Sequence, residues 1–344
     1  MKDSFRDVLG VSRMITRRLF NGFLVAGLAP PITMPARSQT GAGVEEAIAP
    51  LDQLYSIQIQ RGNEVLLAQA PRGPGLDRVA NIKSCSKSIV ALILGTCIAR
   101  NEIPSVDARL VDVAPDLVPQ DATDGVSEIT MEHLVSLTAG LEATSGGNYG
   151  GWIASANWVS DVLTRPIVAE PGSRMIYSTG STHVLGAALT QASGETLLDL
   201  ARDRLGRPMG FEIPPWSRDP QGFYLGGNEM ALTPRAMLAI ALMMRDGGRY
   251  DGDQIVPTDW IEASVVPRAR SPYSGMDYEY GWFITETGYI LARGFGGQVI
   301  AAHPDADLAV AITSDPTRPA NSEGYFGDLV SLLDGPVLDL ARQG

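Results

Sequence analysis

The apolar run at residues 89–99 constrains the fold of this chain more than any other feature, and it closely follows Ser84 and Lys87. The run is long enough for a helix and apolar on nearly every face, so it predicts a buried helix. If that helix opens at Ser84, Lys87 lies on the same face and in the same first turn. The free N–H groups of a first turn can stabilise an oxyanion.

Ser84 and Lys87 form an S-x-x-K motif, which can supply a nucleophile and its base. The positive end of the helix dipole and partial burial both disfavour an ammonium, so they lower a lysine pKa from about 10 towards neutrality. A neutral lysine beside a serine hydroxyl is a general base beside a nucleophile. Only Lys2, Lys83 and Lys87 are lysines among the 27 basic residues, and arginine cannot act as a base near neutral pH. This usage favours proton chemistry at Ser84 over a chance motif on a core helix.

Charge and cysteine placement exclude several classes of protein. A net charge of −12 argues against nucleic-acid binding by a general electrostatic route. Cys85 and Cys97 fall on the same expected helix, roughly 18 Å apart at a rise of about 1.5 Å per residue, which is too far for a disulfide. The histidines at positions 133, 183 and 303 are scattered along the chain. The sequence therefore predicts no metal site and no cofactor.

Residues 1–38 predict a twin-arginine export signal. Arg17 and Arg18 form the twin-arginine pattern, and the apolar stretch after them is too short to span a bilayer. Small residues at positions 36 and 38 offer a cleavage site. We therefore expect a periplasmic or secreted mature chain at 39–344, with no stable membrane span.

Strand patterns lie at both ends of the chain. Residues 39–50 are small and polar, which predicts a linker, and alternating stretches at 55–60 and 65–69 predict a β-hairpin. A helix at 326–341 is expected to close the chain. Successive antiparallel strands are expected at residues 280–284, 289–294, 296–302 and 308–313.

Helical and loop patterns occupy the middle of the chain. Residues 130–137 start like a capped helix, and another helical pattern resumes at 183–192. The glycine-rich stretch 146–151 carries Tyr149 and precedes Trp152, and such loops often form the wall of a site. The middle of the chain is therefore expected to carry part of the site as well as helices.

These patterns predict an α/β fold with an inserted all-α domain, in which an antiparallel sheet is flanked by helices. The α/β part is expected at about 45–80 and 226–344. The helical part is expected at about 81–225.

Tyr177 follows a Pro-Gly turn and precedes Ser178 and Thr179. A tyrosine on a short loop can pass a proton between a nucleophile and a leaving group. On its own the tyrosine fits a packing role equally well.

Taken in order, the motifs resemble those of a known family. The S-x-x-K at Ser84, the Tyr-Ser-x at Tyr177 and the Gly-x-Gly-Gly-Gln at Gly294 are similar to the motifs of the penicillin-recognising serine hydrolases. That group includes class C β-lactamases, DD-peptidases, related esterases and 6-aminohexanoate-dimer hydrolases. The resemblance covers about residues 50–340 and is closest to the branch with the 6-aminohexanoate-dimer hydrolases, because of Gly-x-Gly-Gly-Gln. It implies the β-lactamase/DD-peptidase type of fold.

The resemblance also implies roles for individual residues. Ser84 is the acylated nucleophile, Lys87 its base and Tyr177 the proton shuttle. The backbone N–H groups of Ser84 and Phe295 form the oxyanion hole. The implied substrate-binding residues are Tyr149, Trp152, Thr179, Arg293 and Gly294.

Two positions depart from the family pattern. Thr179 stands where the second motif usually ends in asparagine, and Ala292 stands where the third motif usually has lysine or histidine. Both changes count against β-lactamase activity more than against acyl-enzyme chemistry, although Arg293 would replace the missing cation if its side chain entered the cleft. The leading interpretation is a serine hydrolase acting on a small-molecule ester or amide. The alternatives are a β-lactamase or DD-peptidase, and a catalytically weak protein that binds peptides or peptidoglycan fragments.

Overall fold

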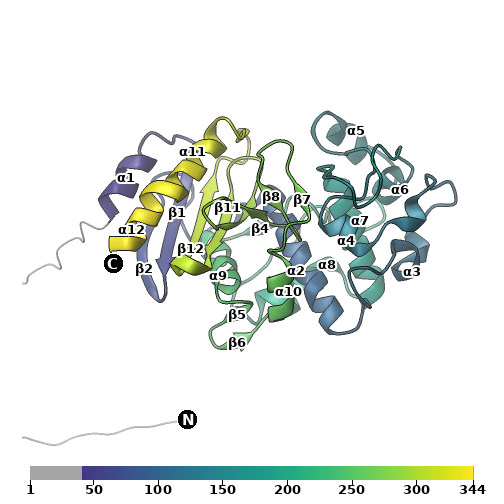
Figure 1. The fold of residues 1–344 in the computed structure, drawn as a ribbon, viewed down its shortest axis with the longest axis horizontal. Coiled ribbons are helices and arrows are strands. Elements are labelled where there is room, and N and C mark those ends of the chain that lie inside the picture. The colour runs from purple at the N-terminus through teal and green to yellow at the C-terminus, as the bar shows by residue number, and fades with distance from the viewer. Residues whose placement is uncertain (1–40, 344) are drawn as a thin grey trace, which may run out of the picture. The chain divides into compact units, whose positions relative to one another are not determined.

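An eight-stranded antiparallel sheet organises the part of the chain that the structure describes (Figure 1). This computed structural model describes residues 41–343, so the export signal predicted at 1–38 lies outside the described residues and stays a prediction. The strand order is β2-β1-β12-β11-β10-β9-β8-β7. The strands are β1 (Leu54–Arg61), β2 (Glu64–Gln69), β7 (Ala269–Arg270), β8 (Asp277–Tyr278), β9 (Phe283–Ile284), β10 (Ile290–Arg293), β11 (Val299–His303) and β12 (Leu308–Ser314).

The sheet takes its strands from both ends of the chain, which confirms the predicted fold class. Strand β1 lies between β2 and β12, and its register pairs Ile57 with Ile312. The predicted hairpin is confirmed as β1 and β2, and the predicted C-terminal strands are present as β9 to β12. Strand β11 begins at Val299 instead of residue 296, because the chain is still turning at Gly297, whose φ is 88°. Strands β7 and β8 are too short for an alternating pattern to predict them.

Each face of the sheet has its own hydrophobic core. One core includes helices α2 (Ser86–Ala99) and α9 (Pro234–Arg245), and the other includes α1 (Ala42–Ile48) and the C-terminal helix. Neighbours on β10 show the alternation, since Ala292 belongs to the first core and Leu291 to the second. Helix α2 is buried along nearly its whole length, as its continuous apolar run predicts.

Helix α1 corrects the linker that was predicted at residues 39–50. Val44 and Ile48 lie four residues apart, so they share one helical face, and both are buried. That pair packs on the core under the C-terminal helix. Two buried side chains among small polar residues were too weak a pattern to predict the helix.

The predicted helical middle of the chain is present. Thr130 caps α4 through a reciprocal capping box with His133, which confirms the predicted capped start. Helix α7 begins at Thr179, earlier than the predicted residue 183. The remaining helical elements and short strands are β3 (Ala80–Asn81), η2 (Lys83–Cys85), α3 (Leu110–Val113), η3 (Pro115–Leu117), η4 (Val126–Glu128), α4 (Met131–Val135), η5 (Gly146–Asn148), α5 (Tyr149–Ile153), α6 (Trp158–Leu163), α7 (Thr179–Ser193), α8 (Leu197–Ala201), η6 (Arg202–Gly206), β4 (Ala231–Leu232), β5 (Arg249–Tyr250), β6 (Asp253–Gln254), α10 (Thr258–Ala263) and η7 (Pro304–Ala306).

The closing helix confirms its prediction and contains a widened turn. It consists of α11 (Tyr325–Leu332), the π-turn η8 (Leu333–Val337) and α12 (Leu338–Gln343). Pro336 lies inside the π-turn, where its missing N–H and its ring are incompatible with regular α-helical bonding. Within the described range no helix is both long and apolar enough to cross a membrane.

Glu279 is a buried carboxyl group between β8 and β9. Its side chain is 0% exposed, and neither carboxylate oxygen has a hydrogen-bond partner. The nearest cation is Arg268, whose Nη1 lies 3.9 Å from Glu279 Oε2. Burial raises the pKa of Glu279 to about 7. The folded protein therefore binds this proton more tightly than the unfolded chain does.

We expect Glu279→Gln to change how stability depends on pH. Wild-type stability is lost as pH rises from 4.5, the ordinary value of a glutamate, through about 7. Glu279→Gln removes this loss. The free energy of unfolding of the variant relative to that of wild type should therefore be about 2 kcal/mol higher at pH 8 than at pH 5. Urea unfolding at the two pH values measures the difference. The exposed Glu286→Gln is the control, and an equal gain at both pH values would contradict the prediction.

Candidate active site

Ser84 lies in a tight turn immediately before the buried helix α2. The turn is the 3₁₀ segment η2, and the α-helix itself begins at Ser86. This corrects the expectation that Ser84 opens the α-helix. The cause is visible at Lys83, whose φ of 50° is left-handed and cannot continue a right-handed helix backwards. The predicted proximity of Ser84 and Lys87 nevertheless holds, because a 3₁₀ turn also brings residues three apart onto one face.

Lys87 is buried beside Ser84. Lys87 is only 3% exposed, and its Nζ lies 3.1 Å from Ser84 Oγ. Lys87 Nζ also donates to Gly227 O at 2.7 Å and to Thr179 Oγ1 at 3.3 Å. A neutral amine has two N–H donors and one lone pair, so these two acceptors leave the lone pair for the Ser84 hydroxyl.

The electrostatics of Lys87 favour the neutral amine. Burial lowers the pKa of Lys87, and nearby Tyr177 acts in the opposite direction with a smaller effect. Cys85 has the same burial and a raised pKa for the same reason, so it stays a neutral thiol. A lowered pKa enlarges the neutral fraction of Lys87, which is the form that can accept a proton.

The second predicted motif meets the first at Lys87. Lys87 Nζ lies 4.9 Å from the centre of the Tyr177 ring. Thr179 is the first residue of α7, and its hydroxyl is hydrogen-bonded to Ser145 Oγ at 3.0 Å. The backbone N–H of Thr179 donates to the same oxygen at 2.9 Å. Threonine therefore keeps the lysine contact that the usual asparagine would make. No sequence pattern indicates Ser145, which lies far from both motifs along the chain.

The turn at residues 294–298 packs directly on the turn that carries Ser84. A Cβ added to Gly294 would lie 2.8 Å from Ile82 O and 2.4 Å from Gln298 Oε1. The buried Gln298 accepts from Gly296 N at 3.1 Å and donates to Ser314 O at 3.0 Å. Its side-chain amide thus fixes the turn to the sheet.

This packing places Phe295 at the candidate oxyanion hole. Cys85 Sγ donates to Gln298 O at 3.5 Å, which joins the residue after Ser84 to the end of the turn. Within residues 41–343 the N–H groups of Ser84 and Phe295 donate to no protein acceptor. Both donors stay available for an oxyanion, as the resemblance implies. The Phe295 side chain is 55% exposed.

Two predicted substrate contacts, Tyr149 and Trp152, have different surroundings. Tyr149 OH accepts from Asn228 Nδ2 at 3.1 Å, and Asn228 directly follows the residue whose carbonyl binds Lys87. Trp152 is fully buried, and its Nε1 donates to Trp158 O at 3.0 Å. The structure gives Trp152 a packing role in place of the predicted substrate contact, because the stretch 146–151 forms η5 and the start of α5 and turns that ring inward.

Arg293 lies beside the site with its guanidinium already bonded. Its Nη1 donates to Ser322 Oγ at 3.2 Å and its Nη2 to Ala320 O at 3.0 Å. The guanidinium carbon also lies 3.5 Å from the centre of the Phe326 ring. Burial lowers the pKa of Arg293. These contacts hold its charge against the segment around residue 320, so Arg293 is a poor replacement for a free cation in the cleft.

A buried histidine–aspartate pair supports the carbonyl that binds Lys87. His183 Nε2 lies 3.0 Å from Asp219 Oδ2, and both side chains are 0% exposed. Gly226 N donates to His183 Nδ1 at 3.4 Å, so the other ring nitrogen carries the proton that Asp219 accepts. A Cβ on Gly226 would lie 2.3 Å from Thr182 O. The sequence shows the Gly226-Gly227 doublet but not this role for it.

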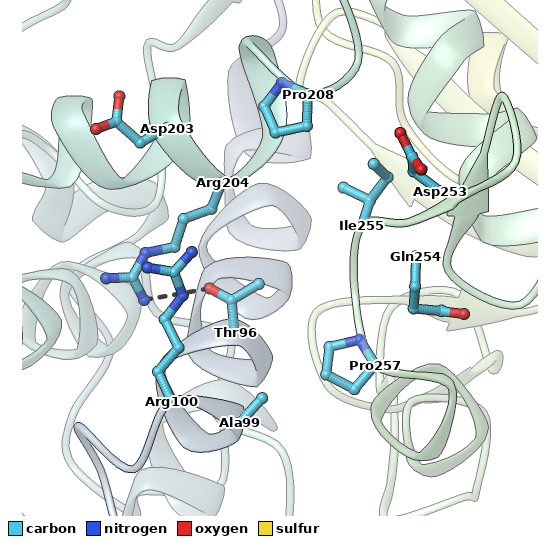
Figure 2. A pocket seen from close by; sticks show the side chains of 10 residues that line it. All are labelled: Thr96, Ala99, Arg100, Asp203, Arg204, Pro208, Asp253, Gln254, Ile255 and Pro257. Carbon is cyan, nitrogen blue, oxygen red and sulfur yellow. Dashed lines mark hydrogen bonds between the residues drawn. The ribbon is translucent and has the colours of Figure 1, made fainter.

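A cavity of about 270 Å³ lies at the opposite end of α2 from Ser84 (Figure 2). Thr96 and Arg100 line it, and Thr96 is about 13 Å along the helix from Lys87 at a rise of about 1.5 Å per residue. Arg204 also lines this cavity, but its guanidinium is bonded to Glu102 and Glu195. The cavity therefore belongs to a buried ion-pair cluster and not to the Ser84 site. In the described part of the chain no group of three or more His, Cys, Asp or Glu residues could hold a metal ion.

Comparison with known families gives one match. Residues 55–325 match the family model described as Beta-lactamase, which covers well over half of the chain. No curated protein matches the sequence.

Solved structures share this fold at low sequence identity. A Bacillus anthracis protein provisionally assigned as a 6-aminohexanoate-dimer hydrolase has a TM-score of 0.71 and 18% identity over 87% of this chain and 81% of its own. EstCE1, a hydrolase with promiscuous acyltransferase activity, has a TM-score of 0.69 and 18% identity over 88% and 97%. A penicillin-binding protein homologue from Caulobacter crescentus also has a TM-score of 0.69 and 18% identity, over 88% of this chain and 97% of its own. These likenesses bear out the fold that the motifs implied.

We expect Gly227→Ala to disable the site without unfolding the protein. The new Cβ would lie 2.8 Å from Thr179 O and 3.3 Å from Lys87 Nζ, so residues 179 and 227, which both hold the amine, must shift apart. A displacement of about 1 Å predicts a loss of about 100-fold in the rate of Ser84 modification by a fluorophosphonate. Gly147→Ala is the matched control, since a Cβ there meets nothing within 4 Å. Equal rates in the two variants would contradict the prediction.

Proposed function

The chain belongs to the Beta-lactamase family, and we propose that it is a serine hydrolase that forms an acyl-enzyme on an ester or amide substrate. In this proposal Ser84 is the nucleophile, Lys87 is its base and Tyr177 is the proton shuttle. The observation that carries it is the 3.1 Å separation of Lys87 Nζ and Ser84 Oγ, with the amine buried and its pKa lowered.

The first half of the proposed reaction acylates Ser84. Ser84 Oγ attacks the substrate carbonyl carbon while its proton passes to Lys87 Nζ. The carbonyl electrons move onto oxygen, where the N–H groups of Ser84 and Phe295 stabilise the negative charge. Collapse of this intermediate breaks the bond to the leaving group, whose oxygen or nitrogen receives the proton through Tyr177.

The second half releases the acyl group. A water molecule adds to the acyl–Ser84 ester and gives up its proton to the same basic groups. Collapse then breaks the ester, frees a carboxylic acid and returns the proton to Ser84 Oγ. No group outside the Ser84, Lys87 and Tyr177 set is needed to balance either half.

Esters and simple amides suit the site better than β-lactams do. Ala292 is fully buried and presents a methyl group where the family usually has a cation. The guanidinium of Arg293 is bonded to Ser322 and Ala320. A β-lactam carboxylate would therefore lack its usual partner, which argues against the β-lactamase or DD-peptidase alternative. The lysine contact made by Thr179 argues against a catalytically weak binding protein.

We expect a covalent adduct on Ser84 that needs a basic residue at position 87. Intact-mass spectrometry after exposure to p-nitrophenyl esters, nitrocefin and a fluorophosphonate detects the adduct, and Ser84→Ala is the control. Lys87→Arg should lower turnover by about 100-fold or more while the protein stays folded, because a guanidinium stays protonated and cannot accept the Ser84 proton. No adduct from any probe on folded protein would favour the binding-protein alternative, and near-normal turnover by Lys87→Arg would remove that residue from the mechanism.

We expect Thr179→Asn to increase acylation by a β-lactam. The asparagine amide would restore the donor that binds a substrate carbonyl, while its oxygen could still accept from Lys87. The gain should be about tenfold, the value of one good hydrogen bond to a bound substrate. Nitrocefin acylation followed by mass spectrometry measures it. An unchanged acylation rate, with ester turnover retained, would show that position 179 does not limit reaction with lactams.

A further inference from the structure

Two residues with side chains adopt left-handed backbone conformations beside the nucleophile. Lys83, which directly precedes Ser84, has φ 50°, and Glu229 has φ 68°. This region is unfavourable for residues that carry a Cβ, so such conformations persist only where surrounding contacts impose them. Their side chains form an ion pair, with Lys83 Nζ 2.9 Å from Glu229 Oε1.

Asn81 extends this ion pair into a closed clamp. Asn81 Nδ2 donates to Glu229 Oε2 at 2.7 Å, so the two carboxylate oxygens have one donor each. The amide oxygen of Asn81 accepts from the backbone N–H of Lys83 at 2.9 Å. Glu229 therefore holds both ends of the short segment that leads into Ser84.

Met230 continues the same attachment on the other side of Ser84. Ile82 N donates to Met230 O at 2.9 Å, and Met230 N donates to Ser86 Oγ at 3.2 Å. Ser86 Oγ in turn donates to Lys83 O at 2.6 Å. The residues before and after Ser84 are thus bonded to residues 229–230, while Gly227 O in the same segment binds Lys87 Nζ.

We propose that Glu229 is a positioning residue that, through Lys83 and Asn81, sets the orientation of the Ser84 turn for acyl transfer. The inference rests on the proposed function. Ser84 contributes both the attacking Oγ and one oxyanion N–H, so a small rotation of its turn misplaces two reacting groups at once. The side-chain hydrogen bonds of Glu229 go to Asn81 and Lys83, and neither Ser84 nor Lys87 is among these partners.

A purely stabilising role predicts a different outcome. The side chains of Lys83 and Glu229 are 19% and 30% exposed, and an ion pair with such access to water contributes little to folding. Loss of the pair should therefore leave the melting temperature within about 3 °C of wild type. Loss of orientation should lower kcat with little effect on KM, because ground-state binding does not use the Ser84 turn.

The test measures kcat, KM and melting temperature for p-nitrophenyl acetate with three variants of the full chain. In Glu229→Gln, the side-chain NH₂ cannot accept a hydrogen bond, so the bond from either Lys83 or Asn81 is lost. In Lys83→Gly, glycine keeps the left-handed backbone without strain, so only the ion pair is lost. Glu132→Gln is the matched control, since its pair with Arg268 has the same 2.9 Å separation and side chains 22% and 33% exposed.

We expect kcat to fall about 10- to 100-fold in Glu229→Gln and Lys83→Gly, with KM within about twofold of wild type. Lys83→Arg, which keeps the charge, should recover most of kcat, and Glu132→Gln should resemble wild type. Wild-type kcat in Lys83→Gly would overturn the inference, because the backbone conformation alone would then suffice. A change confined to KM, with an unchanged single-turnover rate of Ser84 acylation, would also overturn it and make the pair a substrate contact. Absence of Ser84-dependent turnover in wild type would instead be a failure of the proposed function.

Discussion

The burial of the Lys87 amine is the constraint on which the rest of the site depends. Moving an ammonium out of water is costly, so a lysine that is 3% exposed favours its neutral form unless an anion faces it. In the described part of the chain its hydrogen-bond partners are a serine hydroxyl, a threonine hydroxyl and a backbone carbonyl, and none is a carboxylate. Dipoles of this kind orient the amine without restoring its positive charge. Glu229, the carboxylate of the neighbouring segment 226–230, is paired with Lys83 and accepts a hydrogen bond from Asn81.

The fold meets this constraint by bringing three distant segments against the start of one helix. The sheet fixes the turn at 294–298, α7 fixes Thr179, and residues 226–230 lie between α7 and the Ser84 turn. Glycine is required where these backbones approach each other most closely. At Gly226 and Gly294 a Cβ would come within 2.4 Å of another atom. Close packing of these segments buries Lys87, so the glycines and the lowered lysine pKa are parts of one arrangement.

Sequence patterns predicted the parts of this arrangement that are local. The apolar run predicted α2, alternation predicted β1 and β2, and S-x-x-K predicted the Ser84–Lys87 pair. They did not predict contacts whose partners lie far apart in the chain, such as Ser145 with Thr179 or Glu229 with Lys83. They also misplaced Trp152, because a glycine-rich stretch reads as a loop whereas the folded chain coils it into short helices and turns the ring into the core. A left-handed residue such as Lys83 has no sequence signal, since its ion pair is made with Glu229, which lies 146 positions further along the chain.

The two departures from the family pattern lie at positions of different consequence. Thr179 retains a hydroxyl that accepts from Lys87, so the substitution keeps this contact and removes only the amide donor of the usual asparagine. Ala292 points into the core and alters the charge of the cleft without touching Ser84 or Lys87. Neither change disturbs the groups that move protons or stabilise an oxyanion. The interactions that the proposed acyl transfer needs at the reacting atoms are therefore kept, while two polar contacts that would select a substrate have changed. This combination favours a serine hydrolase with a substrate other than a β-lactam.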